Sequence, residues 1–189
     1  MADPHFRAWR SRPLPTHIAS TDKTTSDLLP SSAPADLPSS LHLADLIRST
    51  SLPPATAAKL LAKRLAHDNP NVQLLALQVL DVCVKNGGTP FLRAVADRDP
   101  AAELDRLARN ADNRDVREKV RARVQDWATA FESKPELELS HLVTRYRVMK
   151  DDGITFPARD PTATAAMVDS LSVRGRPNLN PQYRAEHWS

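Results

Sequence analysis

The chain has 189 residues, a formal net charge of +3, 16 prolines and one cysteine. This length suits one domain of about 130 to 150 residues with additional tails. A single cysteine excludes a disulfide within the chain and fits a reducing compartment such as the cytoplasm. No apolar run approaches the roughly 18 uninterrupted residues that would cross a membrane, and the first 15 residues lack the apolar core of a secretory signal.

The excess of positive over negative charge lies at the two ends of the chain. Residues 24–167 hold 19 Lys plus Arg and 19 Asp plus Glu, so their net charge is zero. A nucleic-acid-binding domain is expected to carry a basic excess in the domain itself, so nucleic acid is not an expected partner. We predict disordered tails at residues 1–15 and 158–189. Their arginines are either simply solvated or able to touch anionic lipid: Arg7, Arg10, Arg12, Arg174, Arg176 and Arg184.

The first half of the chain shows the spacing of short helices. Residues 20–30 form a capped pattern closed by proline, which predicts a first helix. A second helix is predicted from Leu37 to about Ser51, and a third over residues 55–67, because apolar residues recur there at spacings of three and four.

The stretch from Asn69 to Phe91 predicts a central helix. It is apolar over most of its circumference, so other elements must cover it. Asn69 and a following proline supply the start, and a lysine followed by two glycines supplies the end. The polar residues Gln78, Asp81 and Lys85 are three and four positions apart, which places them on one narrow stripe.

Four further helices complete the pattern. They are predicted over residues 89–96, from Asp99, from Asn113 and from Pro135 to about residue 150. No alternating strand pattern of useful length appears, and the short connections favour packing of sequential helices. The predicted fold is therefore all-α, with about eight helices layered as a superhelix and no long sequence repeat.

No catalytic, metal or cofactor chemistry is indicated by the residue types. The six histidines are scattered, one thiol is present, and a structural zinc site needs about four paired ligands. Four glycines cannot build GxGxxG or GxxxxGK[ST], and no GxSxG motif occurs. We predict that the protein is not an enzyme, binds no metal and needs no cofactor.

One segment, CVKNGGTPF at residues 83–91, resembles the hallmark at the junction of the fourth and fifth helices of VHS domains. Four other segments match this family in order and spacing, so that the resemblance covers about residues 16–157. They are KTTSDLLP (23–30), LHLADLIRS (41–49), VQDWATAF (124–131) and GITFP (153–157).

The resemblance implies a right-handed superhelix of eight helices. Among VHS subfamilies the chain looks most like the Hrs-like endosomal adaptors, the ubiquitin-sorting subunit of the ESCRT-zero complex. This likeness implies that the protein recognises ubiquitinated membrane cargo for delivery to the vacuole or lysosome, and that it works with other ESCRT-type proteins. The implied location is cytoplasmic and peripheral on the endosome membrane.

The matching ubiquitin-binding positions are Leu37 and Leu41 on the second helix, with leucine in place of the family's tryptophan at the first. Gln73 and Gln78 of the fourth helix are expected at the rim.

Three alternatives remain at this point. Leu41 could pack on the third helix instead of binding a partner. The domain could instead bind a phosphoinositide or anionic membrane, or an acidic sorting-signal peptide in a groove between the sixth and eighth helices. It could also be a rigid spacer, and Trp127, Phe131 and Tyr146 are predicted to join the last two helices. The basic residues considered for the peptide groove are Arg106, Arg109, Arg145, Arg147 and Lys150.

Hrs-like proteins continue after the VHS domain into a zinc-binding FYVE finger that reads a phosphoinositide. Here residues 161–170 resemble the linker, and residues 171–189 contain no cysteine. Three interpretations are open: part of a longer protein, a shortened gene model, or a VHS-only protein.

Overall fold

The computed structural model describes residues 35–97, 99–133, 140–158 and 162, and this part of the chain is built from helices without a strand. Outside the described residues lie the predicted helix at residues 20–30, residues 135–139, the predicted tail at residues 1–15 and most of the predicted tail at residues 158–189. The all-α prediction is confirmed, and the described helices begin and end close to the predicted positions. They are α2 (Leu37–Arg48), α3 (Pro54–Leu65), α4 (Pro70–Asn86), α5 (Thr89–Asp97), α6 (Asp99–Asn110), α7 (Arg114–Glu132) and α8 (Ser140–Asp151).

Side-chain caps explain why two of the longest helices begin where they do. The Asn69 side chain accepts a hydrogen bond from the amide of Asn71 at 2.9 Å, at the start of α4. The Asn113 side chain accepts from the amides of Asp115 and Val116 at the start of α7. An asparagine at this position satisfies amides that have no partner within the helix, so the sequence alone fixes both starts.

The corner between α4 and α5 requires its two glycines. A Cβ at Gly87 would lie 2.7 Å from the carbonyl oxygen of Cys83, which is closer than real contacts allow. Gly88 adopts a φ of +85°, a backbone conformation that side chains disfavour. The corner therefore depends on both residues, and they belong to the segment that carries the family resemblance.

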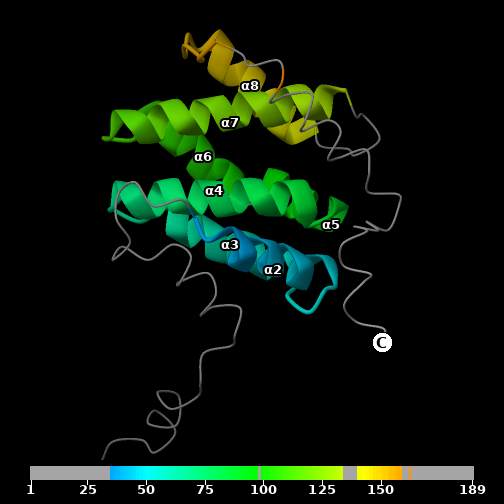
Figure 1. Cartoon of the computed structure of the whole chain (residues 1–189). Helices are drawn as coiled ribbons and strands as arrows, with labels where there is room; N and C mark the ends of the chain where they lie inside the picture. The colour runs from blue at the N-terminus through cyan, green and yellow to red at the C-terminus, as the bar shows by residue number, and fades with distance from the viewer. Residues whose placement is uncertain (1–34, 98, 134–139, 159–161, 163–189) are drawn as a thin grey trace, which may run out of the picture.

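The helices form two packed rows (Figure 1). α2 packs on α4, α4 on α7 and α7 on α8, while α3 and α6 pack against each other behind this row. α5 contacts α3 and α6 and also reaches α8. α4 thus lies in the middle of the domain, between α2 on one side and α7 on the other.

The core is centred on α4, as its apolar composition predicts. Fully burying a valine or leucine side chain contributes about 1.5 to 3 kcal/mol relative to leaving it exposed. Burial also raises the pKa of the Cys83 thiol to about 12, so this thiol is unreactive. The buried residues of α4 are Val72, Leu75, Ala76, Leu77, Val79, Leu80, Asp81, Cys83 and Val84.

The aromatic side chains of the last two helices also have partners outside these two helices. Trp127 of α7 is fully buried, but its indole N–H donates to Asp81 of α4 at 3.0 Å, so it joins α7 to α4. Tyr146 of α8 also makes an edge-to-face contact with Phe156, with ring centroids 4.8 Å apart. Indole N–H groups need a partner when buried, and a carboxylate 46 positions away supplies it.

Candidate functional site

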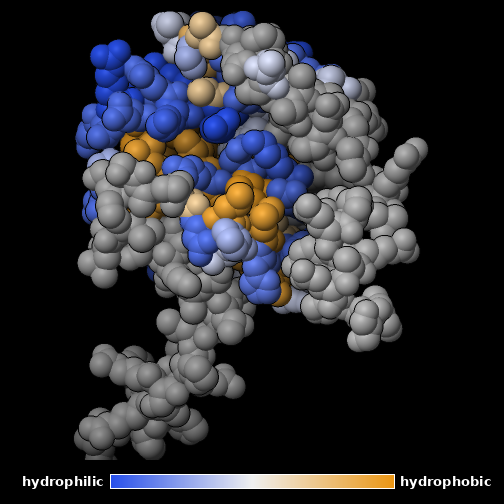
Figure 2. All heavy atoms as spheres, in the orientation of Figure 1, coloured by the Kyte–Doolittle hydropathy of each residue, from blue (hydrophilic) through white to orange (hydrophobic). Residues whose placement is uncertain are grey.

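Two leucines one turn apart remain on the surface of α2. Leu37 is 55% exposed and Leu41 is 42% exposed, and we call this pair the leucine surface. Within the described residues Val148 of α8 is the other large apolar side chain that is exposed. Figure 2 shows hydrophobic side chains gathered over α2 and the adjoining part of α4, with hydrophilic residues around them. This arrangement is typical of a surface that meets a partner.

The opposite face of α2 holds the helix in place. Leu43, Ala44 and Ile47 are buried against the core. The burial pattern therefore separates α2 into a packed face and the leucine surface. Leu41 belongs to the second, since so much of its side chain stays accessible to solvent.

The start of α2 is organised by polar side chains. Asp36 is the N-cap, and its carboxylate accepts from the Ser39 hydroxyl at 2.6 Å. The hydroxyl of Ser40, which is buried, donates to the carbonyl oxygen of Asp36 at 2.8 Å. These bonds lie within one turn, so they define where α2 begins without linking it to another helix.

Gln78 of α4 lies beside the start of α2. Its side-chain oxygen accepts a hydrogen bond from the amide of Ala35 at 2.8 Å, two residues before Leu37. We call Ala35, the leucine surface and Gln78 together the α2–α4 edge. The structure therefore brings Gln78 to the neighbourhood predicted for it.

Gln73 lies elsewhere. Its side-chain nitrogen donates to the carbonyl oxygen of His67 at 2.6 Å. It lines a hollow of about 340 Å³ where the turn between α3 and α4 meets the turn between α6 and α7. Five positions on a helix correspond to about 140° of rotation, so Gln73 and Gln78 point in different directions. Among the four predicted residues, the structure groups Leu37, Leu41 and Gln78 and separates Gln73.

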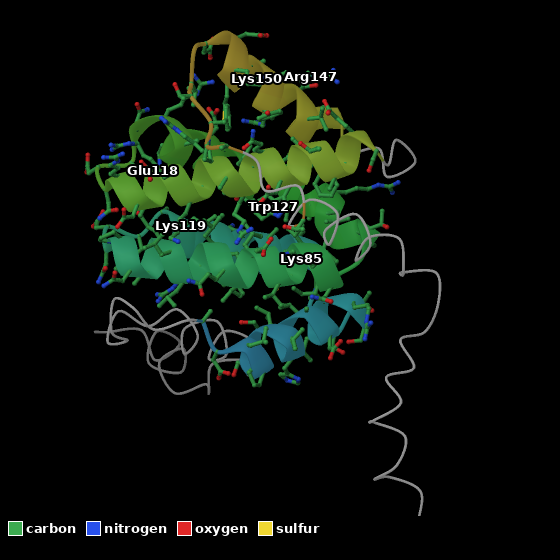
Figure 3. All side chains as sticks on the ribbon, turned by 45° about the horizontal axis from the view of Figure 1, so that its top comes forward. Lys85, Glu118, Lys119, Trp127, Arg147 and Lys150 are labelled. Atoms are coloured by element: carbon green, nitrogen blue, oxygen red, sulfur yellow. The ribbon has the colours of Figure 1, made fainter. Side chains whose placement is uncertain are left out.

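A second polar cluster, missed from the sequence, joins α4 to α7. Asp81 is only 9% exposed, and besides Trp127 it contacts Lys85, whose ammonium lies 2.6 Å from the second carboxylate oxygen. Arg123 of α7 lies 3.9 Å from the same oxygen and 3.2 Å from Asp126. We call these five residues the α4–α7 junction, and Figure 3 shows Lys85 and Trp127 on the two facing helices.

Burial has an electrostatic consequence at the α4–α7 junction. It raises the pKa of the Asp126 carboxyl above its ordinary value, although the guanidinium of Arg123 acts in the opposite direction. The nearby Asp81 carboxylate adds to the increase. One signal in the sequence could have located this junction, because a carboxylate on a helix that is covered on most sides needs a buried partner.

The basic residues considered for a peptide groove are largely paired within the domain. Arg109 lies 3.0 Å from Asp105 and 2.7 Å from Asp152, and these two carboxylates raise its pKa. Arg106 pairs with Glu103 at 2.7 Å. Since both of these α6 arginines already have carboxylate partners, α6 is less suited to bind an acidic peptide than the sequence suggested.

The same holds for part of α8. Arg147 pairs with Glu132 at 3.0 Å, and the Lys150 ammonium lies 5.7 Å from the centre of the Tyr146 ring. Figure 3 shows Arg147 and Lys150 along α8. Arg145 is exposed on that helix.

Neither a metal site nor a membrane span is found in the part of the chain that the structure describes. No three His, Cys, Asp or Glu side chains gather there closely enough to hold an ion. None of the helices described there has the length and apolar character needed to span a bilayer.

Comparison with known proteins identifies the family. The model of the VHS domain matches residues 14–153, which is most of the sequence. The chain therefore belongs to the VHS domain family.

The relatives place it more narrowly within that family. Vacuolar protein sorting-associated protein 27 of Yarrowia lipolytica is 39% identical over 170 residues, covering 89% of this chain and 29% of that protein. The protein of the same name from Neurospora crassa is 40% identical over 144 residues, covering 74% of this chain and 20% of that protein. The chain thus spans less than a third of the length of these relatives.

A solved structure shows the same fold. It is the crystal structure of the VHS and FYVE tandem domains of Hrs, a protein involved in membrane trafficking and signal transduction. It superposes with a TM-score of 0.69 at 26% identity, over 80% of this chain and 67% of that one. The predicted resemblance to VHS domains of the Hrs-like type is confirmed.

Proposed function

We propose that this chain is a non-catalytic adaptor module that binds ubiquitin on membrane cargo and takes part in endosomal sorting to the vacuole or lysosome. The observation that supports it is the leucine surface, an exposed apolar pair on the helix where the family resemblance implies ubiquitin binding. The names of the relatives support the sorting role, since they are vacuolar protein sorting-associated proteins.

The size of the leucine surface favours a weak and reversible contact. Fully burying a leucine contributes about 1.5 to 3 kcal/mol, so covering two half-exposed leucines contributes about the same amount. Association costs at least about 4 kcal/mol in lost freedom, so rim contacts must supply the rest. Since the two leucines alone do not offset this cost, we expect weak binding, with a dissociation constant of about 0.1 to 1 mM, and such an affinity suits cargo that must be passed on.

The proposal includes a location and further partners. The module would act on the cytoplasmic side of the endosome as a peripheral component, together with other ESCRT-type sorting proteins and ubiquitinated cargo. A phosphoinositide of the endosome membrane is a further candidate partner. The acidic-peptide alternative receives less support, because Arg106, Arg109 and Arg147 already face carboxylates of the same chain.

The test is a two-dimensional NMR titration of the labelled chain with unlabelled ubiquitin. We expect shifts concentrated on α2 and the adjoining part of α4, with loss of binding in Leu41→Asp. Val148→Asp is the matched control, because it places the same charge at an exposed apolar position on α8. A well-folded wild-type chain that gives no response at millimolar ubiquitin would contradict the proposal.

A further inference from the structure

The hydrogen bond between Gln78 and Ala35 links two helices at the edge of the leucine surface. Its donor and acceptor lie 43 positions apart, at a distance of 2.8 Å. We propose that Gln78 is a positioning residue: it holds the start of α2 against α4 and thereby fixes Leu37 and Leu41, without itself contacting the partner. The link to ubiquitin rests on the proposed function, whereas the holding of α2 does not.

The first turn of α2 needs such a link because its apolar anchoring is weak. The buried apolar residues of α2 are Leu43, Ala44 and Ile47, all in the second half of the helix. In the first turn Leu37 and Pro38 are exposed, and the buried Ser40 bonds to Asp36 within the same turn. Helix ends with few buried apolar contacts open most easily, so a bond to α4 has its largest effect there.

The position of this bond determines which side chains depend on it. Ala35 directly precedes the N-cap and also packs partly against the core. If its amide were released, the first turn of α2 would separate from α4 before the second turn, and Leu37 would move relative to Leu41. Binding of a partner that contacts both leucines would then include the entropic cost of ordering them, and the affinity would fall.

Gln73 provides a matched control on the same helix. It is also a glutamine of α4 with one side-chain hydrogen bond to a backbone group, but its partner is the carbonyl of His67. That contact ties α4 to the preceding turn and lies away from Ala35. Removing the Gln73 side chain should therefore leave α2 unchanged.

The first measurement is amide hydrogen exchange by NMR on the whole chain without ubiquitin. In Gln78→Ala we expect exchange at Ala35, Ser40 and Leu41 to become about two- to fivefold faster, the range for loss of one exposed hydrogen bond. The amide of Ile47 and the Gln73→Ala variant should match the wild type. Unchanged exchange at all three amides in Gln78→Ala would overturn the proposal.

The second measurement separates positioning from direct contact. Gln78→Ala should weaken ubiquitin binding about two- to fivefold, while Ala35→Pro removes the N–H donor and should have a similar effect. If Gln78 acts through Ala35, adding Gln78→Ala to Ala35→Pro changes the dissociation constant no further. Additive losses in this cycle would show that Gln78 touches ubiquitin and would refute the positioning role.

The two measurements distinguish this proposal from the proposed function. If ubiquitin produces no shifts in the wild-type chain, ubiquitin binding is excluded. The exchange experiment then still decides whether Gln78 holds the first turn of α2.

Discussion

The α2–α4 edge and the α4–α7 junction are built from neighbouring positions on one helix, yet they differ in almost every physical respect. Gln78 and Asp81 are three residues apart on α4. Gln78 makes a neutral hydrogen bond in an exposed place, whereas Asp81 is buried and bonded to both an indole and an ammonium. Hydrogen bonds with a charged partner in a buried place contribute more than neutral exposed ones. The comparison indicates that the polar link between α4 and α7 is the stronger of the two, while the first turn of α2, beside the leucine surface, is linked to α4 by a weaker hydrogen bond.

The largest expected effect comes from breaking the α4–α7 junction at Trp127. Trp127→Ala should lower the free energy of unfolding by about 3 to 5 kcal/mol, since it leaves a cavity and removes the donor to Asp81. Trp127→Phe keeps most of the ring but not the N–H, and should cost about 1 to 3 kcal/mol. Urea denaturation followed by circular dichroism measures both. Equal costs for the two variants would show that the hydrogen bond, and not the packing, carries the effect.

The second prediction compares the two faces of α2. Leu43→Ala should lower the free energy of unfolding by about 2 to 5 kcal/mol, because Leu43 is 2% exposed and its loss leaves a cavity. Leu41→Ala should cost less, about 1 kcal/mol, since 42% of that side chain is already exposed. The same denaturation experiment applies. A large cost for Leu41→Ala would mean that this side chain serves the fold and not a partner.

The smallest effect is expected at Asp126. Burial is the main cause that raises the pKa of this carboxyl in the folded state above its value in the unfolded state. Its contribution to stability is therefore fully present below the unfolded-state pKa and is lost as the pH rises through the folded-state pKa. Asp126→Asn should therefore be slightly more stable than the wild type at pH 7, by at most about 0.5 kcal/mol. Below the unfolded pKa this advantage should disappear. Denaturation at pH 7 and at pH 3 measures the difference, and a loss of stability at pH 7 would show that the ion pair with Arg123 outweighs burial.

Local features of the sequence predicted most of the fold. Asn69 and Asn113 cap helices where they were expected, because capping depends on residues within one turn. The family resemblance predicted a binding surface at Leu37 and Leu41, while the packing of Leu41 on the third helix was left open; both leucines are exposed. The stripe of Gln78, Asp81 and Lys85 was recognised, but its role was not.

The features that the sequence did not predict depend on pairs far apart in the chain. Asp81 and Trp127 are separated by 46 positions, and Ala35 and Gln78 by 43. Periodicity shows that a polar residue faces outward from its own helix, but not which helix lies opposite. The different directions of Gln73 and Gln78, by contrast, follow from their five-residue spacing on one helix and could have been predicted from the sequence.

The buried thiol of Cys83 has a practical consequence. It is the sole cysteine in the sequence, and burial makes it inert at neutral pH. A single cysteine introduced on the surface of α2, for example at His42, should react with maleimide while Cys83 remains unmodified. The wild-type sequence is thus already a background for attaching one spin label or fluorophore, and no core substitution is needed first.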